Sequence, residues 1–198
     1  HDIGHGPFSH VLENTILPGI HHETISLELM TLLNKEFNGR LNLAIEIFTN
    51  KYPKKYLHQL ISSQLDMDRL DYLTRDSFYT GVSEGVVGID RIISMLAVKD
   101  NELVVEEKGI YSIEKFIIAR RLMYWQVYLH KTTLSADQLI TNIMKRAKEI
   151  LANGFELKTT DDLLYFLKLS NPVSLSIQLL ENFNKIDDSD LILNIKQW

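Results

Sequence analysis

The first ten residues, HDIGHGPFSH, hold several side chains that could bind a metal ion or move a proton. They include Asp2 and histidines at positions 1, 5 and 10. Imidazole nitrogens and carboxylate oxygens are common ligands of divalent metals, and histidine is the usual proton donor or acceptor near neutral pH. The alternating glycines at 4 and 6 let the backbone approach a ligand closely. These residue types together indicate a turn that could bind a metal ion.

A second group of polar residues lies in LDMDRLDYLTRDS, at positions 65–77. On a helix of about 100° per residue, the apolar residues of this segment gather on one arc. Asp68, Tyr72 and Asp76 are spaced by four residues and form a polar stripe on another arc. The stripe is either a ligand-facing surface or a solvated charged face.

A third group repeats the same spacing within SIEKFIIARRLMYWQVYLHK, at positions 112–131. Arg120, Tyr124 and Tyr128 recur every four residues. A guanidinium can bind phosphate oxygens in a fork, and a tyrosine ring can pack on a sugar or a base. The stripe therefore fits a nucleotide, although a tyrosine stripe in a core or an interface is the alternative.

Most of the chain has the apolar spacing of amphipathic helices, which predicts an all-α (mainly α) fold. A long helical pattern runs from Ile113 to Gly154, and we expect one break near 132–135. The segment ELVVEEKGIYS, at 102–112, predicts one small β-hairpin. Further helices are expected from Thr160 and from Pro172, and the acidic DDSD at 187–190 is expected to form a solvated turn.

Composition and charge restrict the function classes. The chain has 198 residues, a net charge of -5 and no cysteine. The charge disfavours an extended nucleic-acid surface or binding to anionic membranes, and the lack of cysteine excludes disulfides and thiolate-bound zinc. We find no signal peptide and no apolar run near 20 residues, so we expect a cytoplasmic protein. Because the first residue is a histidine inside a motif, we interpret the chain as a fragment.

The order of the motifs resembles that of the HD-domain deoxynucleoside triphosphate (dNTP) triphosphohydrolases. The resemblance rests on HDIGHGPFSH, then HHE, then LDMDRLDYLTRDSFYTGV, then the Arg-Tyr-Tyr helix that ends in YLHK. It implies one HD-domain helical fold over 1–198, in which 1–150 matches the family core and 151–198 is a helical C-terminal extension. The family has one more metal-binding histidine on a preceding helix, and this chain has no counterpart of it. The fragment by itself is therefore expected to bind metal weakly and could be inactive.

The resemblance also implies a reaction and its catalytic residues. His1, Asp2 and Asp68 match ligands of a divalent ion such as Mn, Fe or Mg. The expected reaction is hydrolysis of a dNTP to a deoxynucleoside and inorganic triphosphate. His22, followed by Glu23, matches the residue that donates a proton to the leaving 5′-oxygen. His5 and His10 match residues that approach the α-phosphate.

The remaining matched residues would contact the nucleotide. Arg69 and Arg120 match phosphate contacts, Tyr72 and Asp76 match sugar contacts, and Tyr128 matches a ring under the deoxyribose. Tyr124 stands where the vertebrate enzyme has a histidine. By resemblance, the protein is expected to form a homodimer or homotetramer. Since His130, Lys131 and Arg91 match residues near an activating nucleotide between subunits, nucleotide activation remains open.

Other readings of the same motifs are weaker or less specific. Cyclic-dinucleotide phosphodiesterases would have lysine after HDIG, and ppGpp hydrolases would have Glu-Asp after the His-Asp pair; this chain has His5 and Ile-Gly. An HD-type nucleotidase or phosphodiesterase acting on another nucleotide stays open, as does a non-catalytic nucleotide-binding domain. The sequence does not determine the preferred base or the physiological metal.

Overall fold

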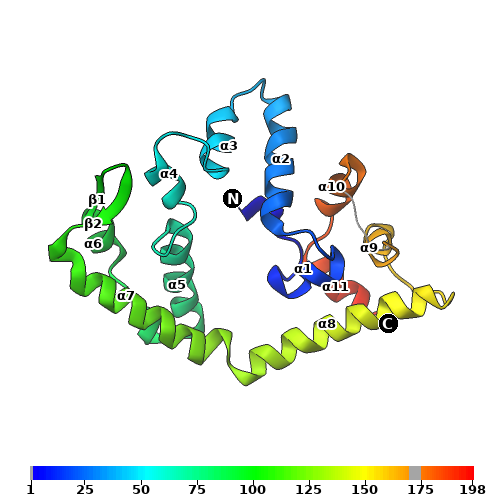
Figure 1. Ribbon diagram of the computed structural model, residues 1–198. Helices are drawn as coiled ribbons and strands as arrows, with labels where there is room; N and C mark the ends of the chain where they lie inside the picture. The colour runs from blue at the N-terminus through cyan, green and yellow to red at the C-terminus, as the bar shows by residue number, and fades with distance from the viewer. Residues whose placement is uncertain (1, 170–174) are drawn as a thin grey trace. The chain divides into compact units, whose positions relative to one another are not determined.

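The computed structural model describes residues 2–169 and 175–198, so His1 and Pro172 lie outside the described residues. Within these ranges the structure is 65% helical, which confirms the mainly α prediction (Figure 1). In chain order, the elements are η1 (Asp2–Gly4), α1 (His10–Ile16), α2 (His22–Glu36), α3 (Asn42–Phe48), α4 (Lys55–Gln59), α5 (Met67–Thr80), η2 (Ser83–Gly85), α6 (Ile89–Ser94), β1 (Leu96–Lys99), β2 (Glu102–Val105), η3 (Glu107–Gly109), α7 (Ile110–Met123), the π-helical turn η4 (Tyr124–Tyr128), α8 (Lys131–Ala152), α9 (Asp161–Leu167), α10 (Ile177–Phe183) and α11 (Asp188–Ile195). Among the described residues, no helix is long and apolar enough to cross a lipid bilayer.

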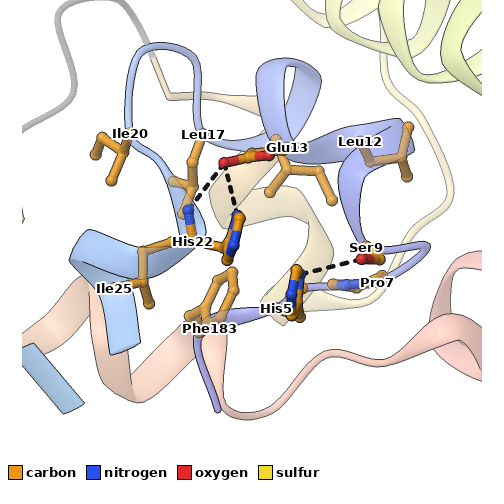
Figure 2. A pocket seen from close by; sticks show the side chains of 13 residues that line it. His5, Pro7, Ser9, Leu12, Glu13, Leu17, Ile20, His22, Ile25 and Phe183 are labelled. Carbon is orange, nitrogen blue, oxygen red and sulfur yellow. Dashed lines mark hydrogen bonds and ion pairs between the residues drawn. The ribbon is translucent and has the colours of Figure 1, made fainter. Parts of the chain in front are cut away.

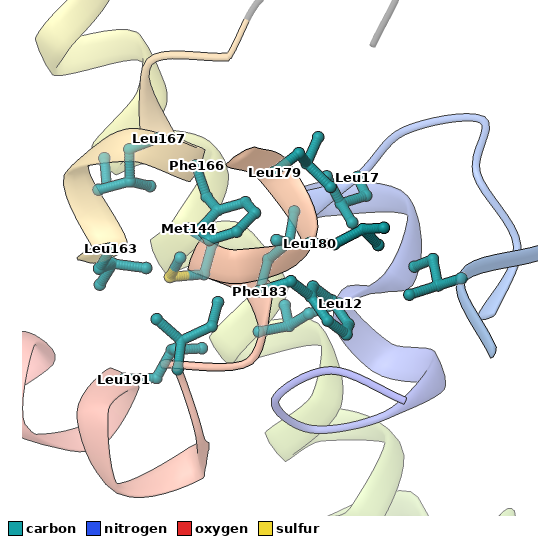
Figure 3. Packing of buried hydrophobic residues seen from close by; sticks show 14 of the residues in the cluster. Leu12, Leu17, Met144, Leu163, Phe166, Leu167, Leu179, Leu180, Phe183 and Leu191 are labelled. Carbon is teal, nitrogen blue, oxygen red and sulfur yellow. The ribbon is translucent and has the colours of Figure 1, made fainter. Parts of the chain in front are cut away.

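The chain divides into two compact units, of which the first comprises residues 1–41 and 135–198. Its core joins the N-terminal helices to the C-terminal ones (Figure 3). Leu12 from α1 and Phe166 from α9 are both buried in this cluster, with Met144 from α8 and Leu191 from α11. Burying each such side chain contributes roughly 1.5–3 kcal/mol. The C-terminal extension is therefore part of the core that holds the N-terminal turn.

The second unit comprises residues 42–134 and has a separate core. Leu70 and Leu73 from α5 pack with Ile92 from α6 and with Phe116 and Met123 from α7. The polar stripe predicted on 65–77 lies on the other side of α5, because Leu70 and Leu73 are buried whereas Asp68, Tyr72 and Asp76 are only half-buried. This helix packing places the stripe at the edge of the unit's core.

The hairpin exists, but the sequence prediction misplaced half of it. β1 and β2 pair antiparallel, with Leu96 opposite Val105 and Lys99 opposite Glu102. Asp100 and Asn101 form the turn, with φ of 51° and 67°. A two-residue turn with both φ positive matches the twist of the strands, and Asp and Asn tolerate that conformation. The predicted turn EEKG instead leads into η3, and Ile110 begins α7.

The break in the long helix also falls earlier than predicted. It lies at Leu129 and His130, after the π-helical turn η4, and α8 begins at Lys131. Two threonines expected at the break instead support the helix start. Thr132 donates its backbone N–H to the His130 ring, and Thr133 donates its hydroxyl to the carbonyl of Val127. These bonds satisfy backbone and side-chain groups that a helix terminus leaves open.

The acidic segment at 187–190 is the start of a helix and not the solvated turn predicted from its composition. Asp187 is the N-cap of α11, and its side chain accepts from the backbone N–H of Asp190 at 3.1 Å. The Asp190 side chain accepts in return from the backbone N–H of Asp187 at 2.8 Å. This reciprocal capping box explains why four acidic or polar residues can begin a helix.

Candidate functional site

Three histidine rings meet where the N-terminal turn joins α1 and α2. The His5 and His22 rings are stacked, with centroids 4.1 Å apart, and the His10 ring lies 4.9 Å from each of them. One ring nitrogen from each histidine falls within 4.8 Å of the others. His5 and His22 are mostly buried, and His10 is exposed. We call these three residues the histidine cluster.

Glu13 is the carboxylate that organises the histidine cluster, and Figure 2 shows its bonds to His22. Its Oε1 accepts from the backbone N–H of His22 at 2.8 Å and from the Nδ1 of the same ring at 3.2 Å. Its Oε2 accepts from Nδ1 of His10 at 3.3 Å. Glu23, which the sequence suggested beside His22, has an exposed side chain. Glu13 follows His10 by three residues, about one turn of α1. This spacing was the sequence signal that could have indicated a contact between them.

The acidity of Glu13 follows from these bonds. Burial by itself disfavours the carboxylate, but the backbone N–H of His22 and the rings of His10 and His22 outweigh burial and lower the pKa of Glu13 to about 2. Glu13 is therefore an anion at every pH near neutrality. This fixed anion bonds Nδ1 of His22 and so orients the ring that the site offers to a ligand.

The stability of the protein should depend on pH through Glu13. Its ordinary pKa is 4.5, and its folded-state pKa is about 2, so folding is favoured by the ionised form. The contribution is fully present above pH 4.5 and is lost as the pH falls toward 2. We expect Glu13→Gln to be less stable than the wild type in urea unfolding above pH 4.5, with the difference shrinking at lower pH. A difference that stays constant over this range would contradict the assignment.

His5 is held as a neutral ring. Burial lowers the pKa of His5, and the positive charges that His22 and His10 can carry lower it further. Its Nδ1 lies 3.0 Å from Oγ of Ser9, which orients the ring. Its Nε2 lies 3.8 Å from Oδ1 of Asp2. A neutral, oriented imidazole can exchange hydrogen bonds with a phosphate without adding a fixed positive charge.

The N-terminal turn is positioned against α2 by a close backbone approach at Gly4. The backbone N–H of Gly4 donates to Oγ of the buried Ser26 at 2.9 Å. A Cβ at position 4 would overlap the carbonyl oxygen of His22 and lie 2.6 Å from Oγ of Ser26. Only glycine allows this contact, which sets the distance between the turn and His22.

Replacing Gly4 with alanine should therefore separate the turn from α2. We expect Gly4→Ala to lower the free energy of unfolding by about 1–3 kcal/mol, as overpacked cores do. Urea unfolding measures this change. Gly88→Ala is the control, because a Cβ there meets only Cβ of Arg91 at 3.7 Å. Since Gly88 is the N-cap of α6, this change should cost no more than about 0.5–1 kcal/mol, less than Gly4→Ala. Equal stabilities for the two variants would contradict the close-approach argument.

In the second unit, the N-terminus of α5 contains three acidic residues in different environments. Asp66 is 1% exposed and accepts from the backbone N–H of Arg69 at 2.8 Å, so it is the helix cap. Asp68 is half-buried, and Asp71 is exposed and pairs with Arg75. The Arg69 guanidinium donates to Asp66 and to the carbonyl of Ser63. Arg69 is thus partly engaged within its own segment, and its buried Nε has no hydrogen-bond partner among the described residues.

The other predicted nucleotide contacts gather between α5 and α7–η4. Tyr128 donates its hydroxyl to Oδ2 of Asp76 at 2.7 Å. The Tyr128 ring makes edge contacts with Tyr72 and Tyr124, with centroids 6.0 and 5.2 Å apart. The Arg120 guanidinium lies 5.6 Å from the centroid of the Tyr124 ring. We call Tyr72, Asp76, Arg120, Tyr124 and Tyr128 the tyrosine cluster.

Two properties of the tyrosine cluster suit a polar ligand. Burial and then the hydrogen bond to Asp76 raise the pKa of Tyr128, and burial raises the pKa of Tyr72, so both hydroxyls stay protonated. The Nε of Arg120 is buried and has no hydrogen-bond partner in the described part of the chain. Buried N–H groups without a partner are rare in folded proteins and are commonly explained by a missing ligand or water.

Comparisons with known proteins identify the family of the chain that carries these two clusters. The model of the family described as the HD-associated region matches residues 87–192, more than half of the chain. The crystal structure of a phosphohydrolase from Bacteroides thetaiotaomicron is 56% identical, has a TM-score of 0.93 and matches all of this chain over 50% of its own. The chain belongs to the HD-domain phosphohydrolase family. The resemblance predicted from the motifs is thereby confirmed.

Other members of this family are more distant or uncharacterized. An uncharacterized protein of Bacillus subtilis is 34% identical over all of this chain and 46% of its own length. The deoxynucleoside triphosphate triphosphohydrolase SAMHD1 homologue of Dictyostelium discoideum is 26% identical over 99% of this chain and 41% of its own length. The chain spans about half the length of the relatives that it matches.

The structure describes two of the three predicted metal ligands, Asp2 and Asp68. Asp2 lies in the first unit beside His5, with 60% of its side chain exposed. Asp68 lies in the second unit, and His1 is outside the described residues. The structure brings His5, His10 and His22 together in the first unit, and the five residues of the tyrosine cluster together in the second.

Proposed function

We propose that the protein hydrolyses dNTPs to a deoxynucleoside and inorganic triphosphate. The observation that carries the proposal is the pairing of His22 with Glu13 at the centre of the histidine cluster. A histidine bonded to an ionised carboxylate can donate a proton to an alkoxide, and two further imidazoles beside it suit the oxygens of a phosphate. Membership in the HD-domain phosphohydrolase family supports a hydrolytic reaction.

A divalent metal ion fits the chemistry of the predicted donors. His1, Asp2 and Asp68 offer one imidazole and two carboxylates, which suits Mn, Fe or Mg. Asp2 is mostly exposed, and its Oδ1 lies 3.8 Å from Nε2 of His5. When bound, such an ion supplies Lewis acidity to a phosphate and lowers the pKa of water.

In the proposed reaction, the three histidines have separate roles at the α-phosphate and at the leaving oxygen. Water attacks the α-phosphorus, a new P–O bond forms, and the bond from the α-phosphorus to the 5′-oxygen breaks. The 5′-oxygen takes a proton from His22, whose Nδ1 is held by Glu13. His5 and His10 contact the α-phosphate oxygens. The attacking water loses one proton to solvent, and His22 regains from solvent the proton that it gave to the 5′-oxygen. The products are a deoxynucleoside and triphosphate.

The tyrosine cluster supports a nucleotide as the substrate. Asp76 can accept from a 3′-hydroxyl while Tyr128 holds its other oxygen, and the Tyr128 ring can pack under a deoxyribose and exclude a 2′-hydroxyl. Arg120 and Arg69 each keep a buried Nε for which a phosphate oxygen is a suitable acceptor. Tyr72 and Tyr124 border the same cluster through their contacts with Tyr128.

Product identity tests the proposal. The intact protein is incubated with Mn²⁺ or Mg²⁺ and each dNTP or ribonucleotide in ¹⁸O-labelled water, and the products are separated and weighed. We expect triphosphate that carries the label, a deoxynucleoside that does not, and weaker hydrolysis of ribonucleotides. Release of labelled monophosphate or pyrophosphate would favour an HD-type nucleotidase or phosphodiesterase. Tight nucleotide binding without any product would favour a non-catalytic nucleotide-binding domain.

A further inference from the structure

The residues before α1 adopt a backbone conformation that needs support from outside the segment. Phe8 and Ser9 have φ of 53° and 47°, in the left-handed region that residues with a side chain rarely adopt. Two such residues in succession precede His10, and Ser9 also carries the hydroxyl that lies on the His5 ring. The orientation of two of the three histidines therefore depends on how this strained turn is held.

The support comes from the C-terminal extension, 180 residues further along the chain. Oδ1 of Asp188 accepts from the backbone N–H of Phe8 at 2.7 Å. A carboxylate acceptor makes this a short charge-assisted bond, stronger than one between neutral groups. The capping box of Asp187 and Asp190 already starts α11, so Asp188 acts on another segment and not on the start of its own helix.

A second residue of the extension contacts the same turn. Phe183, the last residue of α10, is buried, and a Cβ at Gly6 would lie 2.9 Å from its ring. Phe183 lines the same pocket as His5, Glu13 and His22, and its ring lies beside these side chains (Figure 2). The segment from α10 to α11 thus touches the N-terminal turn at Gly6 and at Phe8.

We propose that Asp188 is a positioning residue for the histidine cluster, acting through the backbone of Phe8, with Phe183 as its apolar support. This inference rests on the proposed function insofar as it concerns catalysis. Asp188 does not touch the substrate in this scheme. It holds Phe8 and Ser9 in their left-handed conformation, and that conformation places Oγ of Ser9 on His5 and the start of α1 at His10.

The test compares three variants of the intact protein. In Asp188→Ala the acceptor is lost, and we expect kcat to fall by about 10-fold or more with little change in KM, since small displacements of catalytic groups cost up to about 100-fold. Asp188→Asn keeps a neutral acceptor and should recover to within about 3-fold of the wild type, because the charge-assisted bond is only about twice as strong. Asp187→Ala removes the cap of α11 and should lower the melting temperature without lowering kcat.

A readout independent of activity separates this inference from the proposed function. The stacked His5 and His22 rings shift each other's ring-proton resonances, which can be followed by NMR of protein labelled with ¹⁵N-histidine. Asp188→Ala should move these resonances, and Asp187→Ala should leave them in place. If Asp188→Ala keeps the wild-type resonances, or if Asp187→Ala lowers kcat equally, the positioning role is wrong. A wild-type protein that hydrolyses no dNTP contradicts the proposed function. The histidine ring resonances would still show whether Asp188 positions the histidine cluster.

Discussion

Replacing Asp68 with alanine is expected to abolish triphosphate release from dNTPs while the protein stays folded. Asp68 is half-buried on the polar stripe of α5, whereas the cap of this helix is its neighbour Asp66. The loss of a metal ligand removes several kcal/mol of transition-state stabilisation, which corresponds to at least about 10³-fold in kcat. The assay measures triphosphate and, in parallel, Mn²⁺ bound at equilibrium by the intact protein. Both should fall together.

Two aspartates on the same helix serve as controls for Asp68→Ala. Asp66→Ala removes both the cap of α5 and the buried carboxylate partner of the Arg69 guanidinium, and it should cost about 3–5 kcal/mol of stability. Asp71→Ala removes only an exposed pair with Arg75, so its stability should stay within about 1 kcal/mol of the wild type and its activity unchanged. If Asp68→Ala binds Mn²⁺ as the wild type does, Asp68 is not a ligand, and the assignment fails even if the variant is inactive.

The sequence predicted local patterns better than contacts between distant segments. Spacing by four residues was sufficient to place Asp68, Tyr72 and Asp76 on one side of α5, because the helix period is a local property. The hairpin was misplaced because Lys-Asp-Asn at 99–101 was not recognised as a turn, although two residues with positive φ suit Asp and Asn. Gly109 is typical of a turn in sequence, but here it allows a close approach to Val105 and Met95.

The composition of the site was more predictable than its organisation. The motif order identified the family, and the structure brings His5, His10 and His22 together. The role of Glu13 was missed because its partner His22 is nine residues away across the turn at Pro18 and Gly19. The bond between Asp188 and Phe8 was also missed, since no periodicity links residues 180 positions apart. The acidic composition of 187–190 is typical of a turn. The reciprocal capping bonds between Asp187 and Asp190 are what make this segment the start of a helix.

Replacing Glu13 with glutamine is expected to lower kcat by about 10²–10³-fold, within the range that general acid catalysis contributes. The variant keeps the shape and a hydrogen-bond acceptor for His22 but loses the negative charge beside its Nδ1. KM should change less, because Glu13 lies behind the histidines, with bonds from the backbone and ring of His22 and from the ring of His10. Steady-state kinetics of the intact protein on its preferred dNTP measures both constants.

A substrate analogue with another leaving group and a Glu23→Gln control test whether Glu13 acts through the proton donor. In a dNTP analogue with sulfur in place of the 5′-oxygen, the thiolate leaves without needing a proton, so the loss in Glu13→Gln should shrink to within about 10-fold. Glu23→Gln changes an exposed carboxylate next to His22 in sequence and should stay within about 2-fold of the wild type on either substrate, as surface changes away from the chemistry do. If Glu23→Gln shows the larger loss, or if sulfur substitution does not reduce the loss in Glu13→Gln, Glu13 is not the partner of the proton donor. The comparison thus decides between Glu23, which follows His22 along the chain, and Glu13, which the fold brings to the His22 ring.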